Sequence, residues 1–184
     1  MRYLVLIFIS LLFISATTMK GKYITKNGKV SFYSDAPLEK IEAKNNQLNA
    51  AIDANSGEVF FKVLIKSFIF EKALMQEHFN ENYMESDQFP TATYKGTITN
   101  LKDIDFSKAG KQEAEVDGKL TIHGVTKDVK TKGTINIIKD GISIYVKFKI
   151  QIKDYDIKIP GAVAGKIAEE VEITVDADLK NMVK

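Results

Sequence analysis

The residues of this chain that could carry metal or thiol chemistry are few and far apart. The sequence has two histidines, His78 and His123, and no cysteine. A metal site needs three or four ligands in a fixed geometry, and two distant histidines are a poor start toward one. Without cysteine, neither a disulfide nor a thiolate nucleophile can form. We therefore predict no metal, no cofactor and a structural role for each histidine, with His123 bonded locally to the backbone of its turn.

Carboxylates are numerous, but their spacing places them on a solvent-exposed face. They alternate with apolar residues in two stretches, as Glu113, Glu115 and Asp117, and as Glu170, Glu172, Asp176 and Asp178. A general acid needs a raised pKa, which requires burial. The sequence also contains no nucleophile elbow, phosphate loop or Ser/His/Asp order. We predict no catalytic residue, with Asp154 or His78 as the acid or base if the protein is an enzyme.

The charge balance argues against a nucleic-acid partner. The chain has 26 basic and 24 acidic residues and a formal net charge of +2, with the two signs interleaved. This distribution is not the basic patch of a nucleic-acid-binding protein. The only arginine is Arg2. A chain that loses its N-terminus therefore lacks the bidentate clamp that arginine forms on a phosphate or a carboxylate.

Three central runs, between Ala114 and Ile150, alternate apolar and polar residues. A period of two sustained this long predicts half-buried β-strands. The connections at residues 123–128 and 139–141 are too short for a crossover helix, so the strands are expected to be antiparallel. Such a sheet must close or stack to hide its apolar face.

The same period recurs on both sides of these runs. We expect strands at residues 28–35, 58–68, 91–100 and 169–180, a short strand or tail at 20–26, and two short strands within 39–53 joined by a turn at 44–46. Residues 71–84 have helical spacing and predict one helix, which caps a barrel or covers a sheet. The fold class is therefore mainly β: a closed antiparallel barrel of about eight strands with one short helix. The outward residues Phe60, Leu64 and Phe68 need a cover, which makes a homodimer possible.

The N-terminus reads as a secretory signal peptide over residues 1–18. Arg2 supplies the positive end, residues 4–14 the apolar region, and residues 15–18 the small-residue tail suited to cleavage. The alternative is an uncleaved anchor. We predict one domain over residues 19–184, in a protein that is periplasmic or secreted.

Three segments resemble a known family. They are Met75–Tyr83, then SDQFPTATYKG at residues 86–96, and GKLTIHGVTK at residues 118–127. Together they resemble the YceI-like family of exported bacterial proteins, over nearly all of the chain after the signal. The resemblance implies a lipocalin-like barrel with a helix against it. It also implies an elongated apolar lumen that accepts an isoprenoid-type or other long-chain amphiphilic lipid.

The inward apolar rows are the candidate ligand-binding residues. Burial against lipid or against protein gives the same sequence pattern, so the residues alone leave a tunnel and a filled core equally open. Small residues in these rows (Gly96, Ala114, Gly118, Gly133 and Ala177) either leave room for a lipid or relieve strain where the sheet bends. The resemblance favours the tunnel. The predicted lining residues are Phe32, Phe61, Val63, Tyr94, Ile98, Val116, Leu120, Ile135, Ile144, Val146, Phe148, Ile173 and Val175.

The sequence thus predicts a binding protein that transports, stores or sequesters a lipid by burying it. Two alternatives remain at this point. One is a lipid-modifying enzyme acting at the mouth of the barrel. The other is a ligand-free module that contacts another envelope protein.

Overall fold

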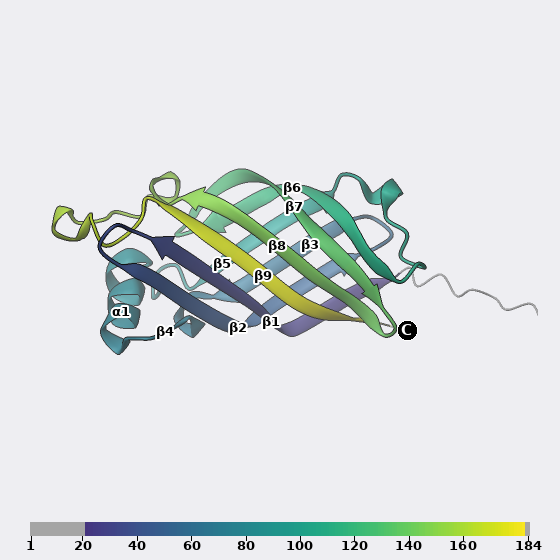
Figure 1. Cartoon of the computed structure of the whole chain (residues 1–184), viewed down its shortest axis with the longest axis horizontal. Coiled ribbons are helices and arrows are strands. Elements are labelled where there is room, and N and C mark those ends of the chain that lie inside the picture. Colours follow the sequence, from purple (N-terminus) through teal and green to yellow (C-terminus); the bar gives the residue numbers. More distant parts are fainter. Residues whose placement is uncertain (1–20, 183–184) are drawn as a thin grey trace, which may run out of the picture.

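Eight antiparallel strands close into a barrel in the computed structural model, which describes residues 21–182 (Figure 1). The predicted signal peptide lies outside the described residues. Neighbouring strands pair in the order β1-β9-β8-β7-β6-β5-β3-β2, and β2 pairs again with β1. The strands are β1 (Lys22–Asp35), β2 (Lys40–Asp53), β3 (Glu58–Leu64), β5 (Thr91–Ile98), β6 (Gly110–Ile122), β7 (Val125–Ile138), β8 (Gly141–Gln151) and β9 (Glu170–Asn181), and a two-residue strand, β4 (Ile69–Phe70), pairs with β2. The predicted fold class is confirmed.

The alternation seen in the sequence determines which way each side chain faces. On β8, Lys147 and Lys149 face outward and pair at 2.8 Å with Glu172 and Glu170 of β9. The residue between the two lysines, Phe148, lies on the inner face. Exposed ion pairs of this kind contribute little to stability. The free energy of closure comes mainly from the apolar inner face.

The strand β2 is continuous, whereas the sequence predicted two strands and a turn at residues 44–46. Asn45 is fully buried, and its side-chain amide donates a hydrogen bond to the carbonyl oxygen of Leu64 at 3.0 Å. Its Oδ1 accepts a hydrogen bond from the backbone N–H of Gln47 at 2.8 Å. The β1–β2 register shifts here, which is the mark of a β-bulge. The polar run therefore signals a bulge and not a turn. Likewise, the two predicted N-terminal segments are joined in β1, with register shifts where they meet.

One predicted outward residue faces inward. Phe60 and Leu64 are 37% and 43% exposed, as expected for the outer face, but Phe68 is only 6% exposed. The 3₁₀ turn η1 (Ile65–Ser67) follows β3 and interrupts its period of two, so Phe68 turns toward the interior. Only two residues of the proposed outer patch therefore remain, and the homodimer stays a prediction.

The predicted helix is present at one end of the barrel. It consists of α1 (Ala73–His78) and a π-helical turn, η2 (Phe79–Tyr83). Figure 1 places α1 beside β4 and the β1–β2 turn, whereas the C-terminus lies at the opposite end of the barrel. The short 3₁₀ turns η4 (Ile152–Tyr155) and η5 (Gly161–Val163) lie between β8 and β9, and η3 (Leu101–Asp103) follows β5. Within residues 21–182, no helix has the length and apolar character needed to cross a membrane.

The two halves of the barrel interior differ. In the half away from α1, inward side chains pack on one another, with Ile142 fully buried and Leu179 1% exposed. The rings of Tyr23 and Phe106 stack in this part of the core with centroids 5.9 Å apart. This half is therefore filled, and any ligand site must lie in the half that carries the helix.

A candidate ligand-binding cavity

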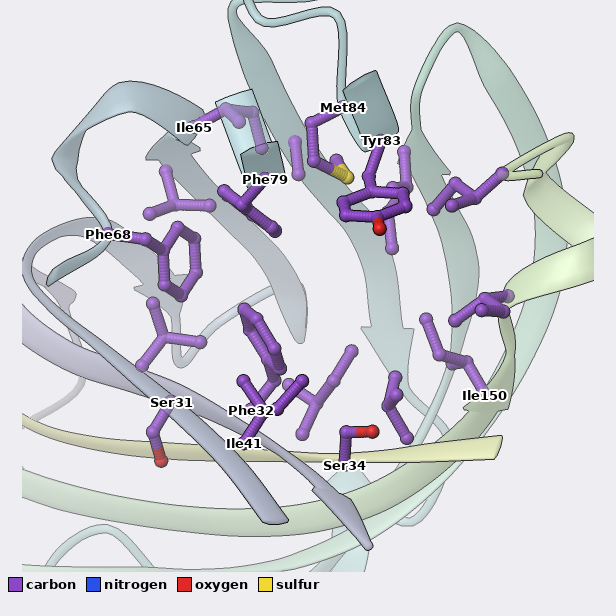
Figure 2. Close-up of a pocket in the computed structure, with 18 of the residues that line it drawn as sticks. Ser31, Phe32, Ser34, Ile41, Ile65, Phe68, Phe79, Tyr83, Met84 and Ile150 are labelled. Carbon is purple, nitrogen blue, oxygen red and sulfur yellow. The ribbon is translucent and has the colours of Figure 1, made fainter. Parts of the chain in front are cut away.

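An apolar cavity of about 510 Å³ lies in the helix-bearing half of the barrel. Its volume falls in the range of about 300–1,000 Å³ that is usual for small-molecule sites. The walls come from the inner faces of the strands, and the residues between β3 and β5 and between β8 and β9 complete them. Figure 2 shows Phe32, Phe68, Phe79, Tyr83 and Met84 directed toward this common space.

Several side chains of the cavity wall remain partly accessible although they face the inside of the barrel. Phe32, Phe61, Val146, Phe148 and Ile173 are only half-buried although they line the inside of the barrel. By contrast, the inward residues Ile98, Ile135 and Ile144 of the filled half are only 3–5% exposed. The wall residues therefore expose apolar surface that a ligand could cover.

Four phenylalanines form an aromatic cluster on one side of the cavity: Phe32, Phe68, Phe70 and Phe79. Phe79 of η2 contacts all three of the others, with ring centroids 4.9 to 5.8 Å apart. Edge-to-face and tilted contacts of this kind stabilise packing beyond the area they bury. The cluster therefore attaches the helical segment to the barrel wall.

Apart from Lys62 of β3, the charged groups of the cavity wall come from α1 and the loops at the same end of the barrel. Lys72, the residue before α1, forms an ion pair with Glu39 of the β1–β2 turn at 3.1 Å. His78 and Lys166 also contribute to the cavity lining. Ser34 is 2% exposed, and its hydroxyl accepts a hydrogen bond from the backbone N–H of Ala168 at 2.9 Å. The site thus has an apolar interior and a polar mouth.

His123 connects three segments at this end of the barrel, where the sequence predicted only a local bond. Its ring Nδ1 lies 3.1 Å from the carbonyl oxygen of Tyr155, and its Nε2 lies 3.1 Å from a carboxylate oxygen of Glu85. The ring also packs edge-on against Phe89, with centroids 4.5 Å apart. The prediction of a local bond is wrong because the β6–β7 turn lies against both neighbouring segments.

Nine of the thirteen predicted lining residues line the cavity: Phe32, Phe61, Val63, Tyr94, Leu120, Val146, Phe148, Ile173 and Val175. The other four do not: Ile98, Val116, Ile135 and Ile144. These four face inward as expected, but they lie further from α1 than the cavity does, in the filled half of the barrel. That any of the thirteen contacts a ligand stays a prediction.

The small inward residues do not enlarge the cavity. None of Gly96, Ala114, Gly118, Gly133 and Ala177 lines it. A Cβ at Gly118 would lie 2.6 Å from Cζ of Tyr94, and one at Gly133 would lie 2.9 Å from Cβ of Val146. These glycines therefore leave room for neighbouring protein side chains and not for a ligand.

Several wall residues were missed because they lie outside the regular strands. They come from η1, the two-residue strand β4, η2 and the loops: Ile65, Phe68, Phe70, Tyr83, Met84, Ile157, Ile159 and Ile167. Ile65 lay in the predicted strand 58–68, on the same face as Phe61 and Val63. The helical spacing that includes Phe79 was the signal for the segment of Tyr83. It indicated a helix but not the direction in which the helix faces.

The residues considered for catalysis do not meet on the wall. His78 lies on it and is exposed, whereas Asp154 is exposed and is not part of it. No group of three or more histidine, aspartate or glutamate residues within residues 21–182 is arranged to hold a metal ion. Burial raises the pKa of Tyr94 above its ordinary value, so its phenol stays protonated in the wall.

A closed eight-stranded antiparallel barrel with an apolar cavity beside the helix α1 defines a lipocalin-like barrel protein. The chain belongs to the YceI-like family, because the model of the YceI-like domain matches residues 10–179. No curated protein sequence matches the chain.

Solved structures share this fold at low sequence identity. A polyisoprenoid binding domain from Saccharophagus degradans, implicated in plant cell wall breakdown, is 14% identical with a TM-score of 0.75, covering 88% of this chain and 98% of that one. BcnA of Burkholderia cenocepacia is 18% identical with a TM-score of 0.69, covering 84% and 96%. A YceI protein of Campylobacter jejuni is 17% identical with a TM-score of 0.55, covering 77% and 85%.

Proposed function

We propose that this protein binds an amphiphilic, isoprenoid-like lipid in the cavity, with the tail inside and the polar end at the mouth. The single observation that carries the proposal is the apolar cavity of about 510 Å³ with charged groups near its opening. The polyisoprenoid binding domain of similar fold supports the choice of lipid. The protein acts by holding its ligand and not by converting it, and it does so in the periplasm or outside the cell.

Burial alone supplies enough free energy for this function. Each methylene that moves from water into an apolar site contributes about 0.8 kcal/mol. A tail of several isoprene units therefore binds tightly without a charged clamp, which agrees with the absence of arginine after Arg2. Specificity then depends on the length and shape of the cavity.

The test uses two neighbouring residues of β8 that face opposite ways. Val146 lines the cavity, whereas Tyr145 is 46% exposed on the outside. Val146→Phe fills part of the cavity, and Tyr145→Phe is the matched control. We expect the delipidated protein and the control to take up a fluorescent geranylgeraniol analogue, and the Val146→Phe variant to bind it about ten-fold more weakly. Thermal unfolding of each variant checks that it is folded.

The outcomes separate the alternatives. Equal binding by both variants would place the lipid outside the cavity. If the parent protein takes up no lipid, the proposal fails and the interaction module becomes the better account. Mass spectrometry of the extracted probe addresses catalysis, because an enzyme returns a modified lipid whereas a binding protein returns it unchanged.

A further inference from the structure

The cavity ends at one level of the barrel although the inward apolar rows continue past it. On β8, Phe148 and Val146 line the cavity but Ile144 does not. On β9, Val175 lines it but Ala177 does not. The sequence pattern gives no reason for this boundary, because the residues on both sides of it are apolar and face inward.

The side chain of Tyr94 lies at this boundary and crosses from one strand to another. It starts on β5 and its ring lies over Gly118 of β6, where a Cβ would be 2.6 Å from Cζ and 2.7 Å from the hydroxyl oxygen. The hydroxyl donates a hydrogen bond to the carbonyl oxygen of Val129 on β7 at 3.0 Å, and it lies 3.4 Å from the carbonyl oxygen of Val116. Because both ends of the ring are held, the side chain cannot easily move aside for a ligand.

A second ring extends this barrier. Phe61, paired with Tyr94 across β3 and β5, has its ring 6.2 Å from that of Tyr94, at an interplanar angle of 16°. The two aromatic side chains therefore form a shelf beside β3, β5, β6 and β7. On the far side of the shelf, Ile98 and Ile135 are each 3% exposed, so no ligand space continues there.

We propose that Tyr94, held over Gly118 and supported by Phe61, is the stop that limits the number of isoprene units that the cavity accepts. The inference rests on the proposed function and names the residue that determines its length specificity. Gly118 has a definite role in this arrangement, because any side chain there would displace the tyrosine ring.

The first test is a length series. The parent, Tyr94→Ala and Tyr94→Phe are titrated with isoprenoid alcohols of increasing length, from geraniol to solanesol. Parent affinity should rise with each unit up to a limiting length and then stop rising. Truncation to alanine removes more non-hydrogen atoms than one isoprene unit contains, so the limit should move by at least one unit. At that length the Tyr94→Ala variant should bind about ten-fold more tightly than the parent.

Tyr94→Phe keeps the ring but loses the hydroxyl bond to Val129, so its limiting length should lie closer to that of the parent than to that of Tyr94→Ala. Tyr145→Phe makes the same change on the outer face, and this control should keep the limit of the parent. A limit that does not move in a folded Tyr94→Ala variant would overturn the inference while leaving lipid binding intact. Failure of the parent to bind any alcohol in the series would overturn the proposed function and the stop together.

The second test needs no variant and therefore does not depend on how well Tyr94→Ala folds. Geranylgeraniol with a diazirine at its hydrocarbon end is bound to the parent and photolysed, and the labelled residues are mapped by mass spectrometry. Labels should concentrate on Tyr94, Phe61 and Leu120. Labelling of Ile98 or Ile135 would show that the tail passes Tyr94. Labelling confined to the mouth of the cavity would show that the tail never reaches Tyr94. Either result would overturn the inference.

Discussion

The imidazole Nδ1 of His123 lies 3.1 Å from the carbonyl oxygen of Tyr155, which joins the β6–β7 turn to the segment after β8. A carbonyl oxygen only accepts hydrogen bonds, so Nδ1 is the donor. Phe89 packs on the same imidazole. One side chain therefore holds together loops that are distant in sequence, near the end of the barrel that carries the cavity.

Replacement of His123 should destabilise the fold. His123 has a φ of 50°, a conformation that asparagine tolerates, so His123→Asn removes the ring contacts with little added backbone strain. We expect the free energy of unfolding, measured by urea titration, to fall by about 1–3 kcal/mol. The exposed Lys127→Ala in the following strand is the control and should leave stability nearly unchanged. A His123→Asn variant as stable as the parent would contradict this role.

The buried phenol of Tyr155 should make the protein less stable at alkaline pH. Burial, assisted by the neighbouring Asp154 carboxylate, raises the pKa of the Tyr155 phenol from 10.0 to about 12. Between these two values the folded protein keeps a proton that the unfolded chain releases, so stability falls as the pH rises through this window. Across this window the Tyr155 phenol lowers the free energy of unfolding by on the order of 2 kcal/mol.

Tyr155→Phe should remove this component and make the decline in unfolding free energy between about pH 10 and about pH 12 shallower. Urea titrations at intervals across the window measure it. Tyr145→Phe removes the same group from an exposed position and should keep the parent slope. Identical slopes for the parent and Tyr155→Phe would refute the assignment.

The aromatic cluster should control the rate of lipid exchange. Phe79 connects the helical segment to Phe32, Phe68 and Phe70, so Phe79→Ala loosens the segment at the cavity wall. We expect a fluorescent isoprenoid to dissociate about ten-fold faster, which corresponds to the loss of roughly one aromatic contact. Stopped-flow displacement by excess unlabelled lipid gives the rate. The exposed Glu77→Ala on the same segment, outside the cavity wall, is the control. Equal rates for Phe79→Ala and the parent would argue against a gating role.

The buried bulge in β2 offers a comparison between adjacent asparagines. Asn45→Ala leaves the Leu64 carbonyl and the Gln47 N–H without their side-chain partner. Each of these part-buried hydrogen bonds contributes about 0.5–1.5 kcal/mol, so the unfolding free energy should fall by at least about 1 kcal/mol. Asn46 is exposed, and Asn46→Ala should change it by less than about 0.5 kcal/mol. Equal effects of the two substitutions in urea titration would rule out a structural role for the bulge.

The sequence was sufficient to predict the barrel but not the extent of its cavity. Strict alternation on β6 to β9 predicted the strands, their pairing and the inward face. Ile144 and Val146 are indistinguishable in that pattern, yet only Val146 lines the cavity. We attribute the boundary to side chains from other strands, such as the Tyr94 ring, which lies over Gly118 of β6 and bonds to Val129 of β7. Alternation carries no information about such a contact.

The irregular segments account for most of the other differences. A single 3₁₀ turn moved Phe68 from the predicted outer face to the interior, and a bulge converted a predicted turn at Asn45 into continuous strand. Both features shift the phase of a period-two pattern by a local change in the backbone. The helical segment was predicted from its spacing, but its position against the aromatic cluster depends on residues that are distant in sequence.

The most direct test of the central claim is native mass spectrometry of the protein purified from its own host, followed by solvent extraction of whatever is bound. The account predicts an added mass in the range of an isoprenoid-like lipid, released on denaturation and reduced in the Val146→Phe variant purified in the same way. A protein that carries no lipid from its host, and that also fails to take up isoprenoid alcohols after purification, would contradict it.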